Sequence, residues 1–133
     1  MDLKNAKVLV TGGSMGIGYA AAKLLIESGA KVVICGRDAK RLETAGKELG
    51  ATPILADVAK EDDVINLVTK TIEALDGYNV LINNAAYGYF SPLTGIDTAK
   101  FNDVLMTNIT GAMMCGRESA KYFTEKNYGN IVN

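Results

Sequence analysis

The 133-residue sequence contains no histidine, and this absence excludes several kinds of site. A Ser-His-Asp triad, a Cys-His pair and a histidine metal ligand cannot form within the chain, so acid–base chemistry must use carboxylates, lysine, tyrosine or a cofactor. We expect no metal site. Cysteine is scarce too, because Cys35 and Cys115 lie far apart and form no C-x-x-C motif. They are predicted to be reduced core thiols of a cytoplasmic protein.

Neither sign of charge dominates. The 14 basic and 15 acidic residues leave a formal net charge of -1, which offers no case for binding nucleic acid or an anionic membrane. Hydrophobic runs are only a few residues long, far short of a membrane span, and the start of the chain has no apolar region typical of a signal peptide. The length suits one domain, residues 1–133.

Short runs rich in valine and isoleucine alternate with helical patterns along the chain. Runs that are apolar at successive positions are typical of parallel strands covered on both faces. The sequence therefore predicts an α/β fold, a doubly wound Rossmann-type parallel sheet of five strands in the order 3-2-1-4-5. Strands are expected over residues 7–12, 31–36, 52–57, 79–84 and 129–133, and helices over 16–28, 39–49, 60–76 and 97–126.

Helical spacing of the apolar residues predicts which helix faces are buried. The expected buried residues are Ile17, Ala20, Ala21, Leu24, Leu25 and Ser28 in the first helix; Val64, Leu67, Val68, Thr71, Ile72 and Leu75 in the third; and Phe101, Val104, Leu105, Ile109, Ala112 and Met113 in the fourth. The fourth helix has further apolar residues off this stripe, Met106, Met114, Cys115 and Tyr122. Together with a fifth strand at the sheet margin, they predict a homo-oligomer.

The turn between the first strand and the first helix is rich in glycine, from Thr11 to Gly18. Gly12 allows a tight turn off the strand, Gly16 lets backbone N–H groups approach a phosphate, and Gly18 lets the helix pack closely on the sheet. The N-terminus of the helix then faces the anion. The alternative is a glycine-rich connector without a ligand, but its position in the first β-α-β unit favours phosphate binding.

Several motifs in order resemble the short-chain dehydrogenase/reductase family. The Thr-Gly-x-x-x-Gly-x-Gly turn is followed by Asp57-Val58, by an Asn-Asn-Ala-Ala segment where the family usually has Asn-Asn-Ala-Gly, by Asn108, and by Gly129–Asn133. The resemblance implies hydride transfer between a nicotinamide cofactor and a small carbonyl or alcohol substrate. The cofactor-binding residues that it implies are Gly12, Ser14, Met15, Gly16, Ile17, Gly18, Asp57, Val58, Asn84 and Ala85.

The end of the second strand indicates which nicotinamide cofactor is preferred. An acid at this position accepts hydrogen bonds from the ribose 2′-hydroxyl of NAD, but the sequence has Gly36 there, followed by Arg37. A planar cation suits a 2′-phosphate, so we expect NADP rather than NAD. The alternative is that Arg37 is a solvated loop charge and that Asp38 only caps the next helix.

Asn108 lies on the apolar stripe of the long helix, where a buried amide must be hydrogen-bonded. A purely structural amide satisfied by backbone is one interpretation. The resemblance implies the other, in which Asn108 supports a water linked to the active-site lysine and so serves catalysis. For Asp57 the alternatives are adenine contact and capping of the following helix.

The family's catalytic serine and its Tyr-x-x-x-Lys pair lie beyond Asn133, where this sequence stops. Two literal Tyr-x-x-x-Lys strings, Tyr19 to Lys23 and Tyr122 to Lys126, fall in helices remote from the strand ends, and we expect neither to be catalytic. The chain is therefore interpreted as the NADP(H)-binding part of an oxidoreductase, either a fragment or a chain completed by another, with no turnover of its own. The alternative is a nucleotide-binding or structural module without chemistry.

Overall fold

The computed structural model describes residues 3–133, and Met1 and Asp2 of the predicted domain lie outside the described residues. One sheet has the order β3-β2-β1-β4-β5, and every paired neighbour is parallel, which confirms the predicted order. Its strands are β1 Lys7–Thr11, β2 Lys31–Gly36, β3 Thr52–Leu55, β4 Val80–Ile82 and β5 Asn130–Val132. The helices are α1 Gly16–Glu27, α2 Ala39–Leu49, α3 Glu61–Leu75, α4 Thr98–Leu105 and α5 Ala112–Lys126, with short 3-10 turns at Leu3–Asn5 and Leu93–Gly95.

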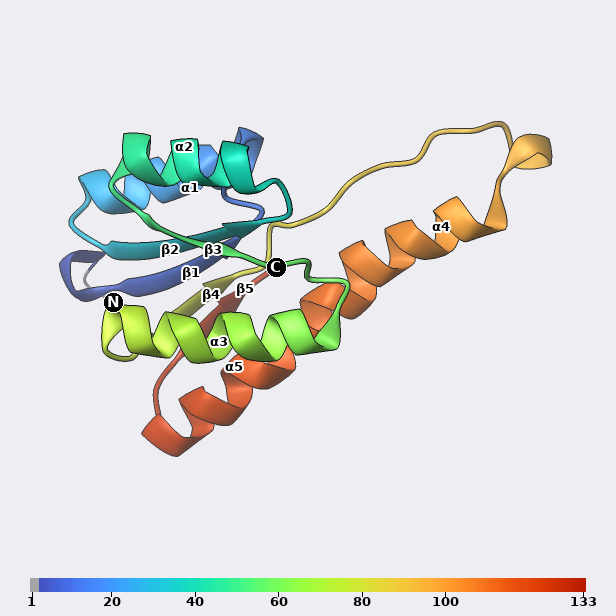
Figure 1. Cartoon of the computed structure of the whole chain (residues 1–133). Helices are drawn as coiled ribbons and strands as arrows, with labels where there is room; N and C mark the ends of the chain where they lie inside the picture. The colour runs from blue at the N-terminus through green and yellow to red at the C-terminus, as the bar shows by residue number, and fades with distance from the viewer. Residues whose placement is uncertain (1–2) are drawn as a thin grey trace.

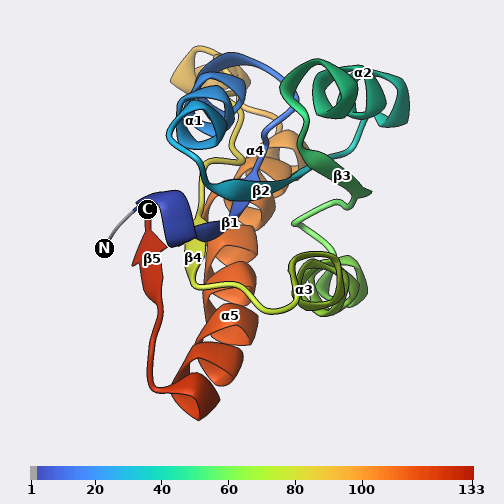
Figure 2. The same ribbon diagram turned by 90° about the vertical axis from the view of Figure 1, so that its left-hand side faces the viewer.

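Helices cover both faces of the sheet. Helices α1 and α2 lie on one face, and α3 and α5 lie on the other (Figures 1 and 2). Successive side chains of β1 point to opposite faces of the sheet. Val8 and Val10 pack toward α1 and α2, whereas Leu9 packs toward α3 and α5. All three side chains are fully buried, as the apolar runs predicted.

The helix ends follow the local sequence signals. Asp38 Oδ1 accepts a hydrogen bond from the backbone N–H of Arg41 and so caps α2, and Gly50 ends that helix with a left-handed φ of 71°. In α3 the predicted buried face is confirmed, apart from the half-buried Ile72. The prediction for α1 is wrong: Ile17, Ala20 and Leu24 are exposed. The buried residues of α1 are small, Gly18 and Ala22, and a prediction from large apolar side chains overlooks them.

The long helix predicted over 97–126 is present as α4, a π-helical segment at Met106–Gly111, and α5. Its predicted buried face is wrong, because Phe101, Leu105, Ile109 and Met113 are exposed, and Val104 and Ala112 are only half-buried. The side that packs against α3 and the sheet consists of Thr107, Gly111, Met114, Cys115, Ser119 and Phe123. Contact is made by small residues here too, since a Cβ on Gly111 would lie 2.9 Å from the carbonyl oxygen of Val58.

Two further features concern the surface. Strand β5 is at one edge of the sheet, and all three of its residues are exposed. The segment from Gly88 through α4 extends away from the sheet (Figure 1), and Phe90 and Leu93 on it are almost fully exposed. Among the described residues, no helix is both long enough and apolar enough to cross a membrane.

Candidate functional site

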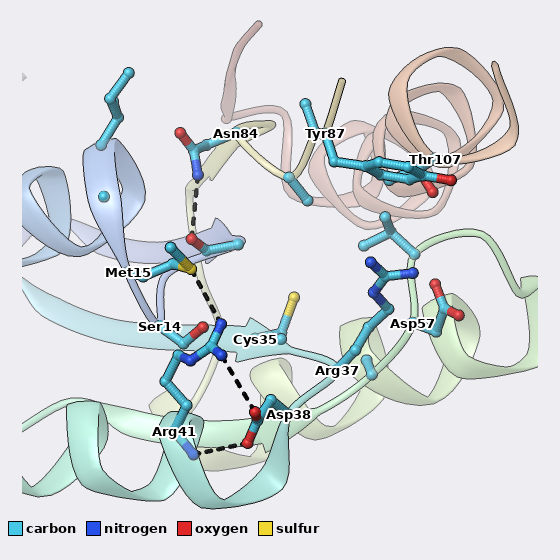
Figure 3. Close-up of a pocket in the computed structure, with 18 residues that line it drawn as sticks. Ser14, Met15, Cys35, Arg37, Asp38, Arg41, Asp57, Asn84, Tyr87 and Thr107 are labelled. Atoms are coloured by element: carbon cyan, nitrogen blue, oxygen red, sulfur yellow. Dashed lines mark hydrogen bonds and ion pairs between the residues drawn. The ribbon is translucent and has the colours of Figure 1, made fainter. Parts of the chain in front are cut away.

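A cleft of about 710 Å³ opens at the carboxyl ends of β1, β2 and β4 (Figure 3). Strand order reverses here, since the chain runs outward from β1 to β2 and β3 and then returns to β4 on the other side of β1. Ligands of doubly wound sheets bind at such a switch point, and the volume falls in the range of small-molecule and cofactor sites.

The glycine-rich loop forms one wall of the cleft. Gly12 has φ +66° and lies so close to the β4 end that a Cβ would be 2.9 Å from Ala85 Cα. Gly16 has φ +58°, and a Cβ there would have no neighbouring atom of the described chain within 4 Å, because it would project into open space beside the cleft. At the N-cap position of α1, Met15 makes no side-chain capping bond, so the first N–H groups of the helix are available to an anion.

A hydrogen-bond network joins this loop to the end of β4. The Nδ2 of Asn84 donates to the carbonyl oxygens of Thr11 (2.9 Å) and Gly12 (3.2 Å). The backbone N–H groups of Asn84 and Ala85 both donate to Thr11 Oγ1, at 3.0 Å each. Gly18 packs beneath the same network, and a side chain on it would collide with Gly12 O and Asn84 Nδ2. The network fixes the loop relative to the sheet.

The end of β2 forms the opposite wall, which Gly36, Arg37 and Asp38 line. A Cβ on Gly36 would lie 3.2 Å from Ser14 Oγ, which leaves little room for a carboxylate. The Asp38 carboxylate is engaged by the α2 cap and by Arg41, whose Nη2 lies 3.4 Å from Asp38 Oδ2. Arg41 also reaches the Met15 sulfur, with 3.1 Å between Nη1 and Sδ. Arg37 lies farther along the cleft, and its guanidinium carbon is 5.5 Å from the centre of the Tyr87 ring.

Asp57 and Val58 line the cleft after β3, together with Ala56 and, from the π-helical segment, Thr107. Asp57 Oδ1 accepts a hydrogen bond from the N–H of Ala59 (3.1 Å). Asp57 therefore orders the turn that leads into α3 but does not cap the helix, because the N-cap position is occupied by Lys60. Asp57 also borders the cleft.

Asn108 does not line the cleft but holds a residue that does. Its Oδ1 accepts from the Tyr87 N–H (3.1 Å), and its Nδ2 donates to the Tyr87 carbonyl oxygen (2.9 Å). These are the backbone bonds of the structural interpretation, and its part in catalysis stays a prediction. The π-helical turn at Met106–Gly111 contains Asn108, and such turns are frequent at functional sites.

No lysine of residues 3–133 lines the cleft, and neither literal Tyr-x-x-x-Lys pair reaches it. The hydroxyl of Tyr19 donates to Glu48 (3.0 Å) on α2, and the Tyr122 ring stacks on Tyr78. Cys35 borders the cleft but is fully buried, and burial raises the pKa of its thiol to about 12. The thiol is therefore not a nucleophile at neutral pH.

Of the predicted site residues, the structure brings together Gly12, Ser14, Met15, Gly16, Ile17, Arg37, Asp57, Val58, Asn84 and Ala85 around one cleft. Gly18 and Asn108 stand behind it. Tyr87 lies in the loop after β4, a position that indicates an aromatic residue lining a pocket, and it does line the cleft. Sequence reasoning missed the cleft position of Thr107, because its placement depends on the π-helical turn, which has no sequence signature.

Comparisons with known proteins place these features among relatives. The sequence model of a family described as short chain dehydrogenase matches residues 6–133. The chain is 42% identical over 133 residues to a glucose 1-dehydrogenase of Gluconobacter oxydans (strain 621H), covering 95% of this chain and 50% of that protein. It is 34% identical to a gluconate 5-dehydrogenase of the same organism, covering 99% and 54%. The chain thus spans about half the length of the curated relatives it matches.

Solved structures agree with this. A short chain dehydrogenase from Mycobacterium smegmatis superposes with a TM-score of 0.94 at 30% identity, covering 100% of this chain and 59% of that one. A short chain dehydrogenase from Bacillus anthracis superposes with a TM-score of 0.92 at 32% identity, covering 97% and 56%.

Proposed function

The chain belongs to the short-chain dehydrogenase family, and we propose that residues 1–133 form the NADP(H)-binding domain of an oxidoreductase. The family uses a nicotinamide cofactor, which supplies the hydride exchanged with a carbonyl or alcohol substrate. In this proposal the chain binds and orients the cofactor, its substrate is a small molecule, and it works in the cytoplasm.

The main support for dinucleotide binding is the open space beside Gly16. There the backbone of the loop is unobstructed by side chains, and the uncapped N-terminus of α1 adjoins it. Backbone N–H groups and the helix dipole together favour a diphosphate at this position. Asp57 and Val58 border the same cleft and are proposed to contact the adenine ring. Asn84 and Ala85, at the end of β4, are proposed to lie beside the nicotinamide ribose.

The preference for NADP rests on the charges at the end of β2. Arg37 forms no ion pair within residues 3–133, and Gly36 places no carboxylate at the end of the strand. The neighbouring Asp38 also lines the cleft, but its carboxylate is paired with Arg41. Arg41 adds a second guanidinium on the same wall of the cleft, although it is paired with Asp38. Guanidinium groups suit phosphate because they donate planar, paired hydrogen bonds.

Titration of the 133-residue chain with NADPH and NADH by calorimetry tests this function. We expect tighter binding of NADPH, and we expect Arg37→Ala to weaken it by about 1–3 kcal/mol, the range for a charge-assisted contact, with little change for NADH. Lys47→Ala is the matched control, because it removes one positive charge from an exposed pair with Glu43 on α2. Equal affinities for the two cofactors, or an unchanged preference in Arg37→Ala, would refute the NADP assignment.

The second candidate is a module that binds the nucleotide without performing chemistry; the cleft lining within residues 3–133 accounts for nucleotide binding in either case. NADPH binding without oxidation of NADPH by simple ketones would support it for the 133-residue chain. Turnover that fell on mutation of Tyr122 or Tyr19 would refute it. In the oxidoreductase proposal, Asn108 has the catalytic supporting role that the family resemblance implies.

We also propose that the chain forms a homo-oligomer. Phe101, Leu105, Ile109 and Met113 form an apolar stripe on the exposed side of the long helix, and the β5 edge is uncovered. Water exposure of such a stripe is unfavourable, and a second copy of the same helix is the proposed cover. A monomer mass by light scattering across a dilution series would contradict it.

A further inference from the structure

Arg37 owes its position in the cleft to an aromatic ring. It is an exposed side chain at the end of β2, and its contact within residues 3–133 is with Tyr87, at 5.5 Å from the guanidinium carbon to the ring centre. This distance is within the range in which an aromatic face attracts a cation. An exposed arginine without such a contact samples many rotamers, and each must be given up when it binds a ligand.

Tyr87 is itself fixed, although it lies in a segment without regular secondary structure. Both polar groups of its backbone are hydrogen-bonded to the amide of Asn108, whose oxygen accepts from the N–H and whose nitrogen donates to the carbonyl. The side chain is half-buried and lines the cleft beside Thr107 (Figure 3). The backbone from which the Tyr87 ring extends is therefore held by the long helix through Asn108.

We propose that Tyr87 is a positioning residue for cofactor discrimination, because its ring holds the unpaired guanidinium of Arg37 ready for the 2′-phosphate. The inference rests on the proposed preference for NADP. It assigns the discrimination to a pair of residues from two loops, one after β2 and one after β4. Tyr87 contributes no charge of its own, and in this proposal its effect on NADPH passes through Arg37.

The substitution Tyr87→Leu removes the ring while keeping an apolar side chain. We expect it to weaken NADPH binding about two- to tenfold, as loss of a cation–π contact and added disorder of Arg37 require, and to leave NADH affinity within a factor of about two. Tyr87→Phe keeps the ring and is expected to retain most of the NADPH affinity. Tyr89→Leu is the matched control, since Tyr89 is a neighbouring loop aromatic that contacts Lys100 and does not line the cleft.

A double-mutant cycle with Arg37→Ala provides a readout that a merely structural role would not change. In the Arg37→Ala background, Tyr87→Leu should no longer affect NADPH binding. Additive effects, or equal losses for NADPH and NADH, would overturn the inference. If the wild-type chain shows no preference for NADPH, the proposed function itself fails; if it shows an Arg37-dependent preference that Tyr87→Leu leaves intact, only the role of Tyr87 fails.

Discussion

At the scale of single residues, Gly16 and Gly18 belong to one motif but have different surroundings. Gly16 → Ala adds a methyl group into open space at a left-handed φ of 58°, whereas Gly18→Ala drives a methyl group into Gly12 and Asn84. We expect Gly16→Ala to cost about 1–2 kcal/mol of stability from backbone strain, yet to weaken cofactor binding strongly because the methyl obstructs the diphosphate. Gly18→Ala should cost about 1–3 kcal/mol or more by overpacking.

Urea unfolding and cofactor titration of both variants separate the two roles. A Gly16→Ala variant that binds NADPH like the wild type would exclude a phosphate beside this glycine. Gly50→Ala is a control, because Gly50 also has a left-handed φ, 71°, and open space around it but ends α2 instead of lining the cleft.

The two cysteines offer a second test at this scale. Cys35 and Cys115 are almost completely buried, and burial raises the pKa of their thiols to about 12 and about 11. Since the thiolate is the reactive form, we expect neither to react with a thiol reagent at pH 8 until the chain unfolds. In urea both should react, which gives the matched control. Rapid modification of either thiol in the folded chain would contradict this, because it would show that the core around that cysteine becomes accessible without global unfolding.

At the scale of elements, a buried hydrogen bond fixes α5 against the segment before β4. The hydroxyl of Tyr78 donates to Ser119 Oγ at 2.7 Å, and its ring contacts Tyr122 and Phe123 of α5. Tyr78→Phe keeps the ring but leaves the buried Ser119 hydroxyl without this donor, so we expect the free energy of unfolding to fall by about 1–3 kcal/mol.

Denaturant unfolding of Tyr78→Phe, Ser119→Ala and the double variant measures this bond. The double variant should be more stable than the sum of the single losses predicts, because the two residues interact directly. Strict additivity would mean that the hydrogen bond contributes nothing beyond the packing of the ring.

At the scale of the whole molecule, the apolar stripe on the long helix should decide the oligomeric state. Ile109→Asp places a charge in the stripe and is expected to shift the assembly to monomers in light scattering, since an unpaired charge is unfavourable in an apolar interface. Leu24→Asp is a closely matched control, because Leu24 and Ile109 are both 64% exposed. Leu24 belongs to α1, which lies on the face of the sheet opposite to α5 (Figure 2). Equal effects of the two substitutions would contradict an interface centred on the stripe.

The sequence alone was sufficient to predict the strand order of the sheet and most of the residues that line the cleft. Unbroken apolar runs such as Val8–Val10 must be covered on both sides, which sets a parallel sheet with helices on each face. The spacing of Gly12, Gly16 and Gly18 predicts the tight turn between β1 and α1, because glycine is needed at each position for a different steric reason. These features depend on local pattern and backbone sterics, which the order of residues encodes directly.

Only the tertiary structure decided which faces of α1 and of the long helix are buried, and which residue contacts Arg37. Helix α1 and the π-helical segment before α5 have glycines at close contacts, Gly18 and Gly111. The larger apolar residues Ile17, Leu24 and Ile109 are exposed, so the spacing of large hydrophobic residues predicts the wrong face there. The contact between Arg37 and Tyr87 joins two loops that are 50 positions apart, and it depends on the backbone clamp from Asn108. Neither arrangement leaves a periodic signal, because each is set by the packing of segments distant in the chain.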